Sequence, residues 1–358
     1  METGNAIELK GVTKRFGDVI ANDNVNLTVR KGEILSILGE NGSGKTTLMN
    51  MLSGIYFPDE GEVYVDGKEV TIRSPKDSFA LGIGMIHQHF KLINILTAAE
   101  NIILGLPGKE KLNMKQVEKE IRELTEQYGF DLNPSQKIYD MSVSQKQTVE
   151  IVKVLYRGAD ILILDEPTAV LTPQETEKLF AVLRNMRKAG KSIIIITHKL
   201  NEVLELSDRV AVLRKGKYID TVETAKATVE SLTEMMVGEK VKLDINRTEP
   251  VGAEKRIEMR GITCRNKEGL KVLTEASFTG YSGEILGVAG ISGSGQKELL
   301  ESVAGLQPIE SGEILYFSPE GTTEKISEMK AEDIKNLGIT LSFVPEDRLG
   351  MGLVGSMG

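Results

Sequence analysis

The fold is decided by one stretch of the sequence, Gly39-Glu40-Asn41-Gly42-Ser43-Gly44-Lys45-Thr46-Thr47. It follows an apolar segment, Glu33 to Leu38, that predicts a strand, and it leads into Thr46 to Ser53, which predicts a helix. The spacing G-x-x-x-x-G-K-[ST] in this strand–loop–helix order is typical of a loop that binds nucleotide phosphates. Its glycines let main-chain N–H groups surround the phosphates, and the helix N-terminus adds a partial positive charge.

The side chains of this loop have separate expected tasks. Lys45 should reach the β- and γ-phosphates of ATP, and Thr46 offers a hydroxyl to Mg²⁺. The alternative is a glycine-rich turn with a surface lysine, which the flanking strand and helix argue against. The residues expected to bind the nucleotide in this loop are Gly39, Asn41, Gly42, Ser43, Gly44, Lys45, Thr46 and Thr47.

A second motif places two carboxylates at the end of a buried strand. The apolar run Ile161 to Leu164 is followed directly by Asp165 and Glu166. We expect Asp165 to hold Mg²⁺, directly or through water, and Glu166 to polarise the attacking water. His198 follows another apolar run and should contact the γ-phosphate at the ligand-binding edge of the sheet. The alternatives are an acidic strand end that only solvates a loop, and a histidine with a purely local partner.

The chain as a whole has an α/β pattern. Short apolar runs alternate with turns and helical segments, which predicts a largely parallel sheet, and a segment of about 96–158 predicts a helical insertion. The net charge of -8 argues against a general nucleic-acid binder. The single cysteine, Cys264, excludes an internal disulfide framework, and we find neither a secretory signal nor an apolar run long enough to cross a bilayer.

The sequence repeats itself. Ile7–Thr13 returns as Ile257–Thr263, and Lys31–Leu35 returns as Ser282–Leu286, so we interpret the chain as a duplication. We expect a first domain at 1–243, a polar linker at 244–255 and the N-terminal part of a second domain at 256–358. Because the second copy has too few residues for a complete domain, we expect it to be the less stable part.

These residues resemble those of the ATP-binding cassette (ABC) family over the whole first copy and all of the second. The resemblance implies a P-loop NTPase cassette with a β subdomain and a helical insertion. Gln88 resembles the Q-loop glutamine that contacts Mg²⁺ and signals to the membrane subunit, and Phe16 resembles the aromatic residue that stacks on adenine. Ala169 to Thr172 resembles the D-loop, and His198 resembles the switch histidine.

Two motifs depart from the family pattern. The signature, usually Leu-Ser-Gly-Gly-Gln, is present only as a variant with Ser144 in place of a glycine; its residues include Ser142, Ser144 and Gln145. In the second phosphate loop, Gln296 stands where the first copy has Lys45, and Lys297 stands where it has Thr46. In the family each ATP lies between the loop of one domain and the signature of the other. We therefore expect this chain alone to bind Mg·ATP and to hydrolyse it slowly or not at all.

An intact first loop followed by a degraded second loop resembles the tandem ATPases of simple-sugar and nucleoside importers. Val344–Arg348 fits that group, with Glu346 at the approximate Q-loop position of the second copy. Two segments, His87–Phe90 and Tyr156–Glu175, resemble the nucleoside branch more than the ribose or galactose branch. The resemblance implies an ATP hydrolase coupled to transport at the cytoplasmic face of the cell membrane. Its expected partners are integral-membrane permease subunits and an external substrate-binding lipoprotein.

Three alternative functions stay open at this point. The first is an importer ATPase for ribose or galactose instead of nucleosides. The second is a soluble tandem ABC ATPase acting on ribosomes or nucleic acid, which the acidic composition and the short linker disfavour. The third is a nucleotide-binding regulator without catalysis.

Overall fold

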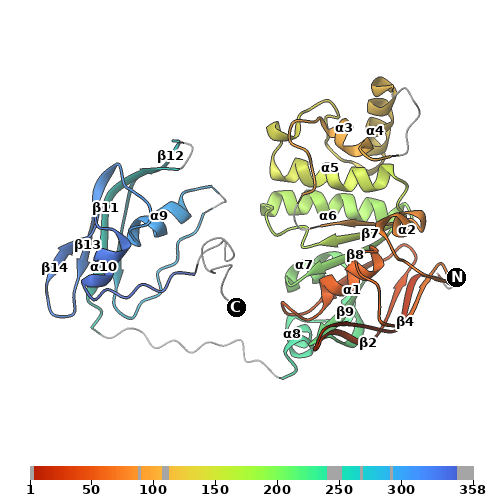
Figure 1. Cartoon of the computed structure of the whole chain (residues 1–358), viewed down its shortest axis with the longest axis horizontal. Coiled ribbons are helices and arrows are strands. Elements are labelled where there is room, and N and C mark those ends of the chain that lie inside the picture. The colour runs from red at the N-terminus through yellow and green to blue at the C-terminus, as the bar shows by residue number, and fades with distance from the viewer. Residues whose placement is uncertain are drawn as a thin grey trace. The chain divides into compact units, whose positions relative to one another are not determined.

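A computed structural model describes residues 4–87, 90–106, 113–239, 252–266, 269–290 and 293–344 (Figure 1). The chain divides into two compact units, Met1–Leu243 and Asp244–Gly358. Each unit is considered by itself below.

Unit 1 is built on a six-stranded sheet that is mostly parallel. Along the sheet the strands are β10 (Lys217–Glu223), β9 (Arg209–Arg214), β3 (Ile34–Leu38), β8 (Ser192–Thr197), β7 (Ile161–Asp165) and β6 (Ile83–Ile86). All pairs are parallel except β10 with β9. The fold expected from the sequence, a largely parallel α/β sheet, is confirmed.

Both faces of this sheet are buried, which explains why its strands are almost continuously apolar. Side chains alternate between two cores along each strand. Ile161 and Ile163 of β7 belong to the core that includes α1 (Lys45–Leu52). Leu162 and Leu164 belong to the core shared with α5 (Val143–Tyr156) and α6 (Pro173–Lys188). The loops at the C-terminal ends of these strands therefore extend from a sheet that is packed on both faces.

A four-stranded antiparallel sheet forms the β subdomain of unit 1. Its order is β2 (Val19–Arg30), β1 (Asn5–Phe16), β4 (Glu60–Val65) and β5 (Lys68–Val70). Buried residues of β1, β2 and β4 share one core with α1 and with β3. This packing places the start of β2 next to the loop between β3 and α1.

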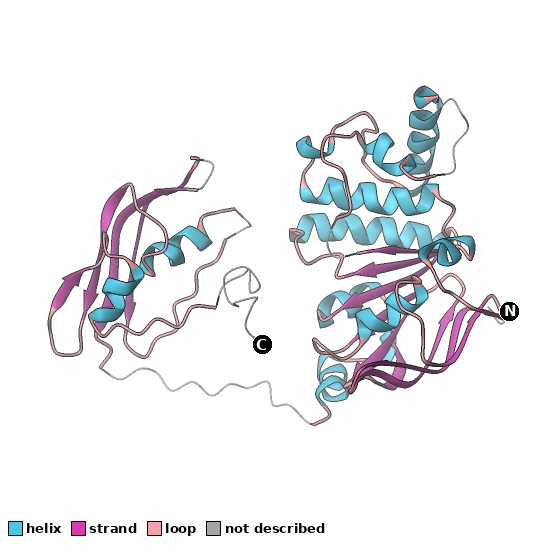
Figure 2. Cartoon of the chain, in the orientation of Figure 1, coloured by secondary structure: helices cyan, strands magenta, loops and turns pink. Residues whose placement is uncertain are grey.

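Helices make up most of the rest of unit 1 (Figure 2). Their bounds are α2 (Pro75–Ala80), α3 (Ala98–Ile103), α4 (Met114–Tyr128), α5 (Val143–Tyr156), α6 (Pro173–Lys188), α7 (Leu200–Leu206) and α8 (Val229–Val237), with 3-10 turns η1 (Ile138–Asp140) and η2 (Thr224–Lys226). The segment 96–158 contains α3, α4, η1 and α5, which share a separate apolar core. The helical insertion expected from composition is therefore present.

Unit 2 repeats the antiparallel sheet of unit 1. Its order is β12 (Lys271–Tyr281), β11 (Lys255–Arg265), β13 (Ser311–Phe317) and β14 (Thr323–Lys325), accompanied by α9 (Gln296–Val303) and α10 (Ala331–Asn336). β11 pairs with β12 and β13 as β1 pairs with β2 and β4. The repeat in the sequence is thus a repeat of this structure.

One part of the repeat differs between the units. Residues 284–290 correspond to 33–39, which include all of β3, but they form no strand in the described structure, and Ile285 is 76% exposed. In unit 1, β3 pairs on its two sides with β8 and β9. No described strand of unit 2 pairs with 284–290, so the apolar side chains of this segment are left exposed.

Candidate nucleotide site

At two positions, the loop between β3 and α1 approaches other main-chain groups too closely to carry a side chain. Gly44 caps α1 with φ at 95°, and a Cβ atom there would lie 2.3 Å from the carbonyl oxygen of Ala21. A Cβ atom on Gly39 would lie 2.3 Å from the carbonyl oxygen of Leu213. Only glycine satisfies both constraints, because it has no Cβ and tolerates positive φ. The main chain therefore carries no side chain at Gly39 and Gly44, which favours the close approach of a phosphate.

Lys45 lies beneath this loop and is 6% exposed. Its Nζ atom donates to the carbonyl oxygens of Gly39 at 2.7 Å and Glu40 at 2.9 Å. Burial lowers the pKa of Lys45, while the charges of Glu166 and Asp165 act in the opposite direction. A buried ammonium group whose partners are mostly neutral carbonyls is well suited to gain stabilisation from an added anion.

Two adjacent groups can hold a divalent cation. Thr46 Oγ1 lies 3.4 Å from Asp165 Oδ2, so a hydroxyl and a carboxylate oxygen face each other across the site. Burial raises the pKa of Asp165, and the nearby Glu166 carboxylate raises it further. Mg²⁺ prefers oxygen ligands, and the Thr46 hydroxyl and the Asp165 carboxylate supply two of them side by side.

Glu166 has three features of a functional carboxylate. Its φ is 49°, an unusual value for a non-glycine residue. Its Oε1 atom lies 2.8 Å from His198 Nδ1. Its Oε2 atom is buried and has no hydrogen-bond partner among the described residues. One carboxylate oxygen is thus oriented by the histidine, and the other is left to interact with a ligand or with water.

These groups surround one cavity of about 670 Å³. Most of the loop and strand-end residues expected from the sequence line it: Asn41, Gly42, Gly44, Lys45, Thr46, Thr47, Asp165, Glu166 and His198. Gly39 and Ser43 belong to the same loop but are absent from the described lining, and the Ser43 side chain is buried behind it. The cavity can therefore accept an elongated anion with its phosphate end at the loop.

The structure adds residues that sequence reasoning missed. The turn between β9 and β10 brings Lys215 and Gly216 to the cavity, and the Gly216 N–H donates to the Ser43 carbonyl oxygen at 3.2 Å. Asn22 is fully buried, and its Nδ2 atom donates to the Gly44 carbonyl oxygen at 3.2 Å. A Lys-Gly pair between two strand patterns was the available signal for the turn, whereas nothing local marked Asn22.

Two expected residues are not placed against the cavity. Phe16 is not part of its described lining; the ring is 43% exposed and lies edge-on to Tyr56, with centroids 5.1 Å apart. Gln88 lies outside the described residues, so its predicted contact with Mg²⁺ stays a prediction.

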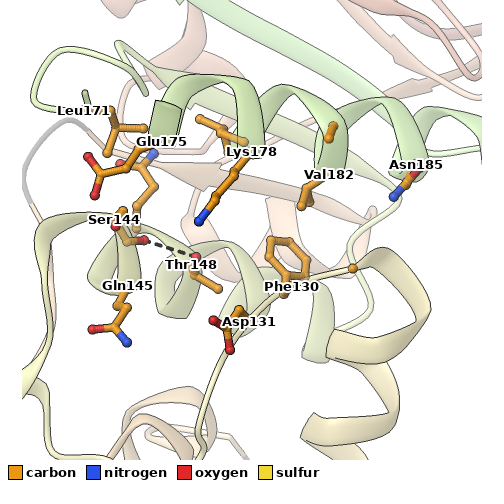
Figure 3. A pocket seen from close by; sticks show the side chains of 14 residues that line it. Phe130, Asp131, Ser144, Gln145, Thr148, Leu171, Glu175, Lys178, Val182 and Asn185 are labelled. Carbon is orange, nitrogen blue, oxygen red and sulfur yellow. Dashed lines mark hydrogen bonds between the residues drawn. The ribbon is translucent and has the colours of Figure 1, made fainter. Parts of the chain in front are cut away.

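The signature-like residues lie elsewhere, at the N-terminus of α5. Ser142 caps the helix by accepting from the Gln145 N–H, and the Ser142 and Ser144 hydroxyls lie 3.0 Å apart. The Ser144 hydroxyl also lowers the pKa of Glu175, at the start of α6. Figure 3 shows Ser144, Glu175 and Leu171 beside a second cavity, of about 470 Å³, between α5 and α6. These residues belong to a different surface from the phosphate loop of the same unit.

The second glycine-rich loop leads into α9. Gly295 caps this helix with φ at 91°, much as Gly44 caps α1. Gln296, at the position equivalent to Lys45, donates from Nε2 to the Val288 carbonyl oxygen at 2.9 Å. This loop has the helix cap of the first but lacks its buried ammonium group. Ile291 and Ser292, from the middle of the motif, lie outside the described residues.

Comparison with solved structures identifies the same fold in known proteins. Unit 1 resembles the ADP conformation of an ATP-binding cassette of an ABC transporter, with a TM-score of 0.57 and 27% identity over 66% of this chain and 96% of that one. It also resembles a dimeric cassette in a post-hydrolysis state bound to ADP and Pi, with a TM-score of 0.54 and 29% identity over 61% of this chain and 98% of that one. Among the described residues, no helix is both long and apolar enough to cross a membrane.

Comparison of sequences gives the family. Residues 22–169 match the ABC transporter family. The nucleoside import ATP-binding protein NupA of Lactococcus lactis is 46% identical, over 99% of this chain and 69% of its own length. The guanosine import ATP-binding protein NupO of Bacillus subtilis is 43% identical, over 97% and 67%. The glucose import ATP-binding protein TsgD13 of Haloferax volcanii is 40% identical, over 98% and 68%. The chain belongs to the family of ABC transporter ATP-binding proteins and is an ATPase of the kind that couples ATP hydrolysis to transport.

Proposed function

We propose that this chain energises the import of nucleosides. The observation that carries this proposal is the order of similarity: the relatives named for nucleoside and guanosine import are 46% and 43% identical, whereas those named for glucose and ribose import are 40% and 39%. The sugar importers form the second candidate, because their similarity also extends over nearly the whole chain.

We propose that ATP binds with its phosphates on the glycine-rich loop. Lys45 would donate to the β- and γ-phosphate oxygens, and the main-chain N–H groups would supply the remaining hydrogen bonds. Thr46 and Asp165 would hold Mg²⁺, which when bound neutralises phosphate charge, and Gln88 would approach it from its own loop. Phe16, exposed at the end of β1, would stack on the adenine. The fit rests on the bare glycine loop and on the buried Lys45 and Asp165 side chains.

Glu166 and His198 would carry out the hydrolytic step. Because His198 Nδ1 lies beside Glu166 Oε1, the carboxylate is held in one orientation with Oε2 left for the attacking water. Oε2 would accept a proton from that water as the water oxygen bonds to the γ-phosphorus. The bond between the γ-phosphorus and the bridging oxygen would break in the same step, and ADP would leave with that oxygen. His198 would then contact the γ-phosphate from the neighbouring strand end.

The same proposal assigns the remaining parts of the chain. Residues 1–243 would form the first nucleotide-binding domain, 244–255 the linker and 256–358 the N-terminal part of a degenerate second domain. Ser142, Ser144 and Gln145 would form the first domain's variant of the family signature. The partners would be integral-membrane permease subunits and an extracytoplasmic substrate-binding lipoprotein. In such an assembly the ATPase would lie at the cytoplasmic face of the membrane. We propose no role with nucleic acid.

The proposal is tested by transport in proteoliposomes. The full-length ATPase is reconstituted with its permease and binding protein, and ATP-dependent uptake of radiolabelled guanosine, adenosine, ribose and galactose is compared. We expect uptake of the nucleosides and none of the free sugars, and we expect a Lys45→Ala variant to abolish it. Uptake of ribose or galactose without nucleoside uptake would establish the second candidate instead.

A further inference from the structure

The loop that carries Glu166 and the loop that carries His198 are joined twice. Glu166 to Thr168 follow β7, and His198 and Lys199 follow the neighbouring strand β8. The first junction is the contact between Glu166 and His198. The second lies two residues further along the first loop, where Thr168 contacts Lys199 and Glu202.

The second junction is a compact hydrogen-bond network. Lys199 Nζ donates to the Thr168 carbonyl oxygen at 3.0 Å, to Thr168 Oγ1 at 3.2 Å and to Glu202 Oε1 at 2.9 Å. Thr168 Oγ1 in turn donates to Glu202 Oε2 at 2.5 Å. The three N–H bonds of the ammonium group each have an acceptor, and the hydroxyl both accepts and donates. Thr168 is 1% exposed, so its own hydrogen bonds are shielded from water at that end, whereas the Lys199 and Glu202 side chains are 37% and 19% exposed.

The network lies where the Glu166 loop needs support. Glu166 has a positive φ, which persists only when the surrounding structure enforces it. On one side its N–H donates to the Ile196 carbonyl oxygen of β8 at 2.9 Å. On the other side the Glu166 carbonyl oxygen accepts from the Ala169 N–H at 3.2 Å within the same loop. The next contact with the loop after β8 is made by Thr168, whose carbonyl oxygen also accepts from the Leu171 N–H at 3.3 Å. The Lys199 contact therefore fixes the chain just after Glu166, as the sheet fixes it just before.

We infer that Thr168, Lys199 and Glu202 are positioning residues that set the spacing between Glu166 and His198 and so control the rate of hydrolysis. None of the three belongs to the described lining of the nucleotide cavity, so they act through the catalytic pair. The inference rests on the proposed roles of Glu166 and His198. A network of this kind should affect kcat much more than ATP affinity.

The test compares two substitutions at Thr168 in the full-length ATPase assembled with its permease. Thr168→Val keeps the shape but removes the hydroxyl, whereas Thr168→Ser retains it. We expect Thr168→Val to lower kcat about 10- to 100-fold while the Kd for ATP changes less than about twofold, and Thr168→Ser to restore the rate. Lys199→Met should reproduce the valine result, which covers the case in which Thr168→Val does not fold.

Three outcomes overturn the inference in distinguishable ways. If both Thr168→Val and Lys199→Met turn over ATP at the wild-type rate while Glu166→Gln is inactive, the positioning network alone is wrong. If activity, ATP affinity and thermal stability fall together and Thr168→Ser restores none of them, the network serves only folding. If Glu166→Gln keeps full turnover, the proposed hydrolytic site is wrong, and the network that depends on it is wrong as well.

Discussion

The two glycine-rich loops of this chain share a helix cap but differ in charge. Gly44 and Gly295 cap their helices with nearly the same φ, 95° and 91°. Lys45 places a buried ammonium group against two carbonyl oxygens of its own loop, and Gln296 places a neutral amide against the Val288 carbonyl oxygen. The two loops thus share a helix-cap conformation, and of these two side chains only Lys45 brings a buried positive charge to its loop.

The apolar segments that precede the two loops differ as well. Ile34–Leu38 is fully buried between two parallel neighbours, whereas Ile285 and Val288 are exposed and the segment 284–290 has no described strand partner. An apolar sequence thus becomes a central strand only where neighbours are available to pair with it. The comparison predicts different results from matched changes in the two units.

The largest effect should come from the Glu166 carboxylate of unit 1. Glu166→Gln removes the proposed proton acceptor but keeps the shape of the side chain, so kcat of the assembled transporter should fall about 10²- to 10⁴-fold with ATP affinity retained. The exposed Glu177→Gln on α6 is the control and should leave kcat unchanged. Steady-state phosphate release checks both. Wild-type turnover in Glu166→Gln would remove the general base from the mechanism.

The next effect separates the two helix caps. A Cβ atom at Gly44 would lie 2.3 Å from a carbonyl oxygen, and one at Gly295 would lie 2.6 Å from another, both at positive φ. Each alanine variant should lose about 1–3 kcal/mol of stability in its own unit. Only Gly44→Ala should weaken ATP binding, by tenfold or more. Titration with a fluorescent ATP analogue, alongside denaturant unfolding, measures both; loss of ATP binding in Gly295→Ala would show that the second loop also binds nucleotide.

A smaller effect depends on pH. Burial raises the pKa of Asp165, so its carboxylate contributes to stability when protonated and costs stability as pH rises through that raised pKa. Asp165→Asn should therefore increase the melting temperature above that pH in the absence of metal. Mg²⁺ requires the ionised form, so Mg²⁺-dependent ATP binding should weaken as pH falls, beginning above the usual range of aspartate. The variant should lose both the Mg²⁺ dependence and this pH dependence.

The smallest effect should be found at the signature-like segment. The Ser144 hydroxyl lies beside the Ser142 hydroxyl, and it lowers the pKa of Glu175. Ser144→Gly should raise the pKa of Glu175 towards its ordinary value and should increase ATP turnover of the assembled transporter a few-fold, equivalent to about 1 kcal/mol. Carboxyl NMR titration and phosphate release measure the two results. An unchanged or lower turnover would mean that Ser144 does not restrict hydrolysis.

Most of the fold could be predicted from local patterns. Short apolar runs such as Ile193–Ile196 indicated strands buried on both faces, and Gly44 followed by Lys45 located the loop and the start of α1. Asp165 and Glu166 were grouped with that loop because an acidic strand end accompanies a phosphate loop, and His198 was added by the rule that ligands bind at the C-terminal edge of parallel strands.

What could not be predicted depends on contacts between distant segments. The Asn22 side chain and the Gly216 N–H donate to carbonyl oxygens of the loop, and the local sequence indicates neither of these two contacts. The Thr168–Lys199 contact joins residues whose pairing becomes visible only when β7 and β8 are neighbours. The exposure of Ile285 was equally hidden, because its sequence alone resembles that of a buried strand.

The central claim is that the first loop, and not the second, holds the triphosphate of ATP. Equilibrium titration of the 358-residue chain with Mg·ATP tests it most directly, using the wild type, Lys45→Ala and Gln296→Ala. We expect one site per chain, an affinity about 10- to 150-fold weaker in Lys45→Ala, and no change in Gln296→Ala, because only Lys45 supplies a charged contact worth about 1.5–3 kcal/mol. Unchanged affinity in Lys45→Ala would contradict the account.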